Sequence, residues 1–279
     1  MIYKAIKYRV DDRVARVTLN RPERMNALSL QLCREVNHAV EAADRNDGVR
    51  VIVINGSGGK AFSAGYDLNE LEAPGGNASG SGKRPGVAAW RKRLDDGVQY
   101  NFTLWNCSKP VIAMIDGYCL AGGLEFVQMC DIRYASDVSK FGVVSTRFAN
   151  GVATLAMPWI IGPACRELIY SGDTIDAAEA LRIGLVNKVF PKSALERETM
   201  KLAKRISRVA LACLQWNKRA INNTYHTMGF RSAMQYGVEA CCLLDTTETP
   251  EFKAFEAIRR KSGVQAAIKW RHKQFKPFE

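Results

Sequence analysis

One carboxylate and a glycine pair stand together in the segment Ile112–Asp131, where an apolar run leads directly into a predicted helix. Gly122 and Gly123 begin that helix, and Glu125 follows within its first turn. The first N–H groups of a helix lack intrahelical partners and can stabilise a developing negative oxygen. We expect glycines here because a side chain would block a ligand's carbonyl and because the turn needs backbone angles that other residues avoid. A strand-to-helix turn with a buried structural glutamate would show the same pattern.

A second glycine-rich turn lies upstream. The β-branched run Val51–Ile54 predicts a buried strand, and glycines and serines follow it before Asp67 and Leu68 begin another helical pattern. A glycine therefore stands at a second passage from strand to helix. By its spacing alone, this segment is equally typical of an ordinary strand-to-helix loop.

The residues of these two turns resemble the signature motifs of the crotonase, or enoyl-CoA hydratase/isomerase, superfamily. Ala61–Leu68 reads AFSAGYDL and Asp116–Glu125 reads DGYCLAGGLE, and in that family such segments supply the two N–H donors of an oxyanion hole. Matches over Val14–Leu28 and Leu168–Asn187 extend the resemblance along nearly the whole chain. The resemblance implies an α/β fold with a crotonase-type repeated ββα spiral core and a C-terminal helical trimerisation region.

The resemblance also implies roles for individual residues. The N–H groups of Tyr66 and Gly122 would hold the thioester oxygen of an acyl-CoA, and Glu125 would be the catalytic acid and base. The residues expected to bind substrate or coenzyme A are Arg24, Ala27, Phe62, Ala64, Asp67, Leu68 and Gly123, with Lys269 and Lys273 assigned more loosely from a neighbouring subunit's C-terminal helix.

Two departures from the family pattern concern the reaction. Hydratases of the family carry a second glutamate in a segment resembling FGxPE, whereas Phe141–Ser145 reads FGVVS and ends on Ser145. The stretch that follows, Ala149–Pro158, is shorter than its family counterpart. We expect Ser145 to hold a water molecule or to fill space.

The missing glutamate leaves several reactions open. Hydration of a 2-enoyl thioester needs water activated toward C3, a proton for C2 and an oxyanion hole, and one carboxylate can serve both proton transfers through that water. Isomerisation of an enoyl-CoA double bond needs only one base. Hydrolysis of an acyl-CoA would need a base near Ser145. None of the three histidines, His38, His226 and His272, is obviously placed to provide it.

Length and composition agree with one α/β unit and a helical appendage. The chain has 279 residues, 47% of them hydrophobic and 24% charged. We divide it into residues 1–192, the core with the CoA and catalytic site, and residues 193–279, a helical oligomerisation region. The resemblance implies a homotrimer or a dimer of trimers.

Cysteine spacing and the N-terminal pattern bear on cofactors and location. The eight cysteines contain no CxxC pair and no histidines at zinc spacing, so we expect reduced thiols and no metal or redox cofactor, with coenzyme A as part of the substrate. The N-terminus alternates like a strand, and no apolar run is long enough to span a bilayer. We expect a soluble cytoplasmic protein, in the cytosol or an organelle matrix, with no membrane partner.

The net charge of +12 indicates either an anionic partner or a basic face that is exposed to solvent. Basic residues concentrate in Lys83–Arg93, Lys201–Arg208 and Lys253–Lys276, which fits the phosphates of coenzyme A. Arginine-rich runs interleaved with aromatics are missing, so we expect no nucleic-acid partner. A non-catalytic RNA-binding or scaffold member of the fold is the alternative from another functional class.

The periodicity of the sequence predicts the elements that position these residues. Beyond residue 193 the pattern is helical, and the glycine-rich stretch 74–86 predicts a loop. We expect residues 74–90 to order on ligand binding, and Trp90 and Trp105 to line the acyl pocket or simply to pack in the core. The predicted elements are a hairpin over residues 1–20, a helix Ser29–Asn46, strands Val51–Asn55, Val111–Ile115 and Ile132–Ala135, and helical spacing in Leu202–Ile221 and Ala233–Leu244.

Overall fold

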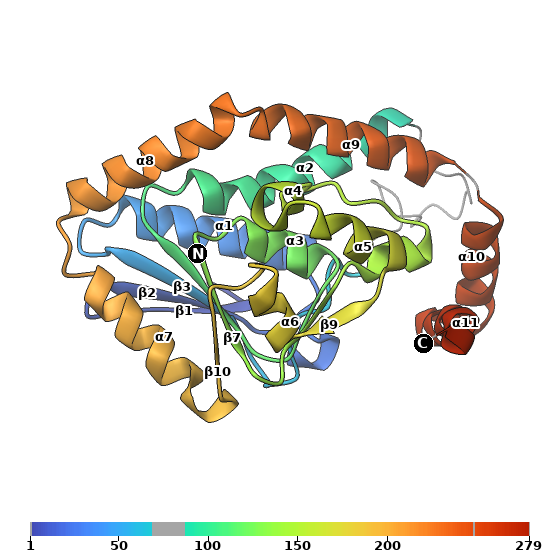
Figure 1. Cartoon of the computed structure of the whole chain (residues 1–279), viewed down its shortest axis with the longest axis horizontal. Coiled ribbons are helices and arrows are strands. Elements are labelled where there is room, and N and C mark those ends of the chain that lie inside the picture. The colour runs from blue at the N-terminus through green and yellow to red at the C-terminus, as the bar shows by residue number, and fades with distance from the viewer. Residues whose placement is uncertain (1, 69–86, 248, 279) are drawn as a thin grey trace.

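The computed structural model describes residues 2–68, 87–247 and 249–278 (Figure 1). Its strands form two mixed sheets, one of six strands in the order β1-β2-β3-β5-β7-β10 and one of four in the order β4-β6-β8-β9. The strands are β1 Ile6–Asp11, β2 Val14–Leu19, β3 Val51–Gly56, β4 Ala61–Ser63, β5 Val111–Ile115, β6 Tyr118–Leu120, β7 Ile132–Ser136, β8 Lys140–Gly142, β9 Thr174–Asp176 and β10 Lys188–Phe190.

The helices cover both sheets and continue to the C-terminus. They are α1 Leu30–Arg45, α2 Val87–Asn106, α3 Gly122–Gln128, α4 Met157–Ile161, α5 Ala164–Ser171, α6 Ala177–Arg182, α7 Lys192–Ile206, α8 Leu211–Thr227, α9 Phe230–Thr246, α10 Pro250–Ser262 and α11 Val264–Phe275, with short 3₁₀ turns η1 Pro22–Arg24, η3 Val144–Phe148 and η4 Lys276–Phe278. Within the described residues, no helix is both long and apolar enough to cross a membrane.

A repeated pair of strands organises the core. In each repeat a longer strand joins the six-stranded sheet and a three-residue strand then joins the four-stranded sheet: β3 with β4, β5 with β6, and β7 with β8. Both sets of successive strands pair in parallel. This is the ββα spiral that the sequence predicts, and it brings the turns after β4 and β6 to neighbouring strands of one sheet.

The expected N-terminal elements are present. β1 and β2 form the antiparallel hairpin, with Ile6 opposite Leu19. The helix predicted over Ser29–Asn46 is α1, and the Ser29 side chain caps it by accepting a hydrogen bond from the Leu32 N–H at 3.1 Å. The buried side chains of α1 recur at helical spacing and pack into the main core.

The C-terminal region begins with a helix that belongs to the packing of the sheet. Leu195 and Ala203 of α7 form a core cluster with residues of β3, β5 and β7. The helical pattern expected across Leu202–Ile221 is interrupted, because α7 ends at Ile206 and α8 begins only at Leu211. The division of the chain at residue 192 stays a prediction.

Helices α8 and α9 lie across the molecule above α2 (Figure 1). Trp105 of α2 stacks on Phe230 of α9, with 4.4 Å between ring centroids, and donates a hydrogen bond to His226 at 3.2 Å. Trp105 therefore packs between helices, the plainer of its two expected roles. Farther along the chain, Phe255 of α10 packs on Phe148 of η3.

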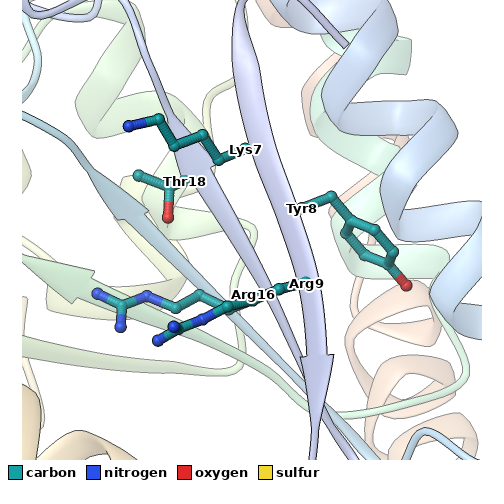
Figure 2. A pocket seen from close by; sticks show the side chains of 5 residues that line it. All are labelled: Lys7, Tyr8, Arg9, Arg16 and Thr18. Carbon is teal, nitrogen blue, oxygen red and sulfur yellow. The ribbon is translucent and has the colours of Figure 1, made fainter. Parts of the chain in front are cut away.

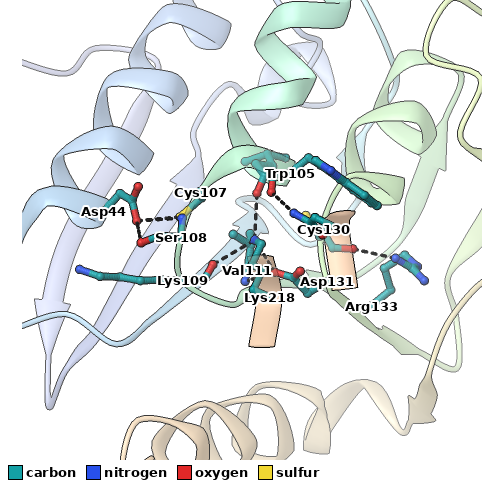
Figure 3. A network of polar contacts seen from close by, with 12 residues as sticks. Asp44, Trp105, Cys107, Ser108, Lys109, Val111, Cys130, Asp131, Arg133 and Lys218 are labelled. Atoms are coloured by element: carbon teal, nitrogen blue, oxygen red, sulfur yellow. Dashed lines mark hydrogen bonds and ion pairs between the residues drawn. The ribbon is translucent and has the colours of Figure 1, made fainter. Parts of the chain in front are cut away.

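A buried lysine of α8 bonds to residues around the start of β5 (Figure 3). The Lys218 ammonium donates hydrogen bonds to the carbonyls of Leu104 and Lys109 and pairs with Asp131 at 2.8 Å. The same Asp131 oxygen accepts the N–H of Val111 at 2.7 Å, at the start of β5. Burying an ammonium is favourable only with such partners.

We predict that Lys218→Met will lower the free energy of unfolding by about 3 kcal/mol, because Asp131 and two carbonyls then lose a charged donor. Urea unfolding of the variant and the wild type measures the difference. Arg219→Met is the matched control, since Arg219 is the exposed neighbour on the same helix and its removal should cost under about 0.5 kcal/mol. Equal losses in the two variants would contradict the role given to Lys218.

Candidate active site

The two glycine-bearing turns of the sequence meet in space. A Cβ atom added to Gly65 would lie 3.0 Å from the Cβ of Ala121 and 3.1 Å from the backbone nitrogen of Gly122. The peptide unit that joins Gly65 to Tyr66 therefore packs against the one that joins Ala121 to Gly122. A side chain here would push these neighbours apart by a few tenths of an ångström, and the φ of 101° at Gly65 also favours glycine.

Hydrogen bonds to the neighbouring carbonyls orient both N–H groups. The Gly65 carbonyl accepts from the N–H of Leu28 at 2.8 Å, and the Ala121 carbonyl accepts from the N–H of Glu125 at 3.0 Å. The N–H of a trans peptide points opposite to its carbonyl. The Tyr66 N–H is thus directed away from Leu28, and the Gly122 N–H is directed out of the start of α3. An oxyanion hole requires two adjacent N–H donors, and each of these two points away from the hydrogen-bonded carbonyl of its own peptide unit.

The reason for Gly122 and Gly123 differs from the one expected. Neither has a positive φ; the unusual angles belong to Ala121, with φ 47° and ψ −124°, and to Gly65, with φ 101°. A Cβ on Gly122 would lie 2.5 Å from the Tyr66 ring, and one on Gly123 would lie 2.7 Å from the Ser63 carbonyl. Close packing against β4 and the residues after it therefore excludes side chains here, and the expectation of unusual angles at this pair was wrong.

Glu125 is buried in the first turn of α3, with 5% of its surface exposed. Its Oε2 accepts a hydrogen bond from the Thr154 N–H at 2.8 Å. Burial raises the pKa of the Glu125 carboxyl to about 7, against the lowering effect of the bonds to Thr154, and nearby Asp245 raises it further. A carboxyl that titrates near neutral pH can both give and take a proton.

A buried asparagine connects the two sides of the site. Asn101 of α2 donates hydrogen bonds to the Thr154 hydroxyl at 2.8 Å and to the Tyr66 hydroxyl at 3.4 Å. Burial raises the pKa of the Tyr66 phenol well above its ordinary value, so the phenol stays neutral. Neither Asn101 nor Thr154 is predicted from the sequence, because no motif spans the 53 positions between them.

Ser145 occupies the position of the missing glutamate, on η3. Its Oγ is buried and forms no hydrogen bond with any described residue. The three histidines have other contacts: His38 with Tyr3, His226 with Trp105, and His272 with the Phe148 ring. The described residues thus contain no serine–histidine pair at Ser145.

Comparison with known proteins identifies the family of the chain. Residues 9–262 match the family described as enoyl-CoA hydratase/isomerase. The chain belongs to the enoyl-CoA hydratase/isomerase family. It is 34% identical over 233 residues to the crotonyl-CoA hydratase of Syntrophomonas wolfei, covering 81% of this chain and 85% of that protein. It is 33% identical over 258 residues to the (E)-benzylidenesuccinyl-CoA hydratase of Thauera aromatica, covering 88% and 93%.

The fold of the family is equally clear. The crystal structure of an enoyl-CoA hydratase/isomerase from Xanthobacter autotrophicus Py2 superposes with a TM-score of 0.89 at 34% identity, covering 98% of this chain and 99% of that one. The α/β crotonase fold expected from the motifs, with two mixed sheets and C-terminal helices, is confirmed.

Some residues of the family motifs have structural partners within the chain. Asp67 is buried and pairs with Arg21 at 2.8 Å, and Arg21 also donates to the Ala27 carbonyl at 2.7 Å. Phe62 is fully buried and packs against Phe126. These contacts hold the loop after β2 against the Tyr66 turn.

Other predicted ligand-binding residues lie at the surface or border the site. Arg24 is exposed at the end of η1, whereas Ala27, Ala64 and Leu68 are half-buried. Lys269 and Lys273 are exposed on α11, which packs on η3 of its own chain. Whether these two lysines reach a neighbouring subunit's site stays a prediction. Residues 74–86 lie outside the described residues, so the gating role also stays a prediction, and Trp90 lies on α2 beside Arg93.

A basic hollow of about 240 Å³ lies elsewhere, on the N-terminal hairpin (Figure 2). Lys7, Arg9 and Arg16 line it together with Tyr8 and Thr18, although the Tyr8 side chain points away from the three basic side chains. Arg16 already donates a hydrogen bond to Asn55 at 2.8 Å and pairs with Glu196. The lining contains none of the residues around Glu125.

The raised pKa of Glu125 predicts how stability depends on pH. The folded state disfavours the ionised carboxylate, so wild-type stability is lost as pH rises from the ordinary value of 4.5 through about 7. Glu125→Gln keeps an acceptor for the Thr154 N–H and removes the ionisation. Its advantage over wild type in free energy of unfolding should grow by about 2–3 kcal/mol between pH 5 and pH 8.5. Urea unfolding at both pH values measures this, and a constant difference would contradict the raised pKa.

Proposed function

We propose that this protein hydrates 2-enoyl-CoA thioesters, as a hydro-lyase. The observation that carries the proposal is the buried Glu125 carboxyl in the first turn of α3, the helix that begins at Gly122, where burial raises its pKa to about 7. The names of relatives from Syntrophomonas wolfei and Thauera aromatica support the same reaction class.

In the proposed reaction, the Tyr66 and Gly122 N–H groups bind the thioester oxygen and stabilise the enolate. Water adds to C3 and Glu125 exchanges protons with that water and with C2, as a single acid and base. One such donor is worth roughly 2.7–4 kcal/mol of barrier, and a positioned acid or base about 10²–10⁴-fold in rate. Ser145 would hold a water molecule through its buried hydroxyl.

The proposed substrate contacts follow the family motifs. Arg24, Lys269 and Lys273 would bind the phosphates of coenzyme A, whereas Ala27, Ala64, Leu68 and Gly123 would border the thioester. Phe62 and Asp67 would act by holding the turns in place, since their side chains have partners within the chain.

We also propose that the chain assembles as a homotrimer or a dimer of trimers, in which a neighbour's Lys269 and Lys273 would complete the CoA site. The cytoplasmic location stays a prediction. One relative, from Dictyostelium discoideum, is named a mitochondrial enzyme.

Isomerisation of an enoyl-CoA double bond is the second candidate. The serine at position 145 favours it, because moving a proton from C2 to C4 needs only Glu125. Acyl-CoA hydrolysis has less support, since Ser145 has no hydrogen-bonded base among the described residues. A non-catalytic RNA-binding role would give the buried Glu125 no task.

We predict that the wild type adds one water to 2-enoyl-CoA esters in deuterated water and that Glu125→Gln lowers this turnover about 10²–10⁴-fold. Mass spectrometry of a panel of 2-enoyl- and 3-enoyl-CoA esters separates the possibilities. Bond migration without water addition would replace the hydratase proposal with the isomerase, and release of free CoA would indicate a hydrolase. Wild-type turnover by Glu125→Gln would contradict the role of Glu125.

A further inference from the structure

The face of α9 that turns toward the catalytic site carries an acidic residue that no family motif contains. Gly237 packs against the Ala153 carbonyl, where an added Cβ would lie at 2.6 Å. One turn later, Cys241 packs against Gly151, whose added Cβ would lie 2.5 Å from the sulfur. Asp245 follows Cys241 by one further turn on the same face.

The segment before α4 runs antiparallel to this face. Four helical residues advance by about 6 Å along α9, which carries its face from Gly237, beside Ala153, to Cys241, beside Gly151. The next turn of α9, which holds Asp245, continues past Gly151 in the direction of η3, where the chain turns at Ala149 with φ 57°. The Asn150 N–H donates to the Ser145 carbonyl at 3.1 Å, so this end of the segment lies on Ser145.

The same segment supplies the hydrogen bond to Glu125, from the Thr154 N–H. Glu125 therefore contacts the segment 149–154 at Thr154, and Asp245 lies toward its other end. Two further observations place them near one another. Burial is the main cause of the raised pKa of both Glu125 and the Cys241 thiol, the negative charge of Asp245 raises both further, and Glu125 also raises that of Cys241. The Asp245 Oδ1 atom is buried, although the residue as a whole is half-buried.

We propose that Asp245 is the second catalytic carboxylate of this enzyme, supplied by α9 in place of the glutamate that Ser145 replaces. This inference rests on the proposed hydratase function and gives Asp245 the proton transfer from water that Glu125 would otherwise carry out alone. Asp245 takes a proton from the water as its oxygen bonds to C3, and the electrons of the C2–C3 double bond move through C1 to the thioester oxygen to form the enolate. The thioester carbonyl re-forms as C2 takes the proton of Glu125. The proton on Asp245 then returns to Glu125 through solvent, which completes the addition of one water.

The test compares hydration of a short 2-enoyl-CoA by wild type and Asp245→Asn. We expect kcat to fall about 10²-fold or more while KM stays within about threefold, since the acyl and CoA contacts are unchanged. Glu239→Gln is the matched control on α9: Glu239 is half-exposed and pairs with Arg91 at 2.5 Å, so its kcat should stay within about twofold.

A second variant distinguishes the loss of a catalytic carboxylate from a loss of folding in Asp245→Asn. Ser145→Glu in the Asp245→Asn background restores a carboxylate at the family position and should recover at least tenfold in kcat. Equal kcat for Asp245→Asn and wild type would overturn the assignment and leave the hydratase proposal standing. Failure of the Ser145→Glu rescue would also overturn it. A wild type that hydrates no enoyl-CoA would contradict the hydratase proposal, and this inference with it.

Discussion

The contact between two peptide units is the constraint on which the site depends. Gly65 lies against Ala121 and Gly122 so closely that an added Cβ would meet the Gly122 nitrogen at 3.1 Å. The contact arises because β4 and β6 are parallel neighbours in the small sheet, so the turns that follow them leave the sheet at one edge. The ββα repeat thus brings together two N–H donors that are more than fifty residues apart in sequence.

The proposed chemistry also requires that the Glu125 carboxyl can keep its proton close to neutral pH. Glu125 is enclosed by α3, and Thr154 provides its hydrogen bond, while Asn101 joins that threonine to the Tyr66 hydroxyl. Burial and a nearby Asp245 oppose ionisation, and the hydrogen bonds partly offset them. Asp245 of α9 thereby raises the pKa of a carboxyl on α3, although the two helices are far apart in the sequence.

Local patterns of the sequence were enough to predict the fold and the two glycine-bearing turns that meet in space. Strand Val111–Ile115 and the helix over Ser29–Asn46 were predicted closely because their periodicity and capping are local. The Tyr66 and Gly122 turns were found because glycine motifs carry them. The contacts of Asn101 and Thr154 and the effect of Asp245 on Glu125 were not predicted, because they depend on packing between distant segments.

The same limit explains the errors of interpretation. Gly122 and Gly123 are required by the Tyr66 ring and Ser63, which a sequence cannot place beside them. The interruption between α7 and α8 was hidden because apolar spacing continues across residues 207–210. The pairing of Asp67 with Arg21 was not predicted either, and the expected binding role of Asp67 stays a prediction.

The central claim is that the Tyr66 and Gly122 N–H groups bind one carbonyl oxygen. Infrared difference spectroscopy of hexadienoyl-CoA labelled with ¹³C at the thioester carbonyl measures the polarisation of that bond directly. Binding to the protein should move the carbonyl band to lower frequency, and Gly122→Ala should reduce the shift, because its Cβ would displace the Tyr66 ring. A bound ligand whose carbonyl band stays at its frequency in water would contradict the account.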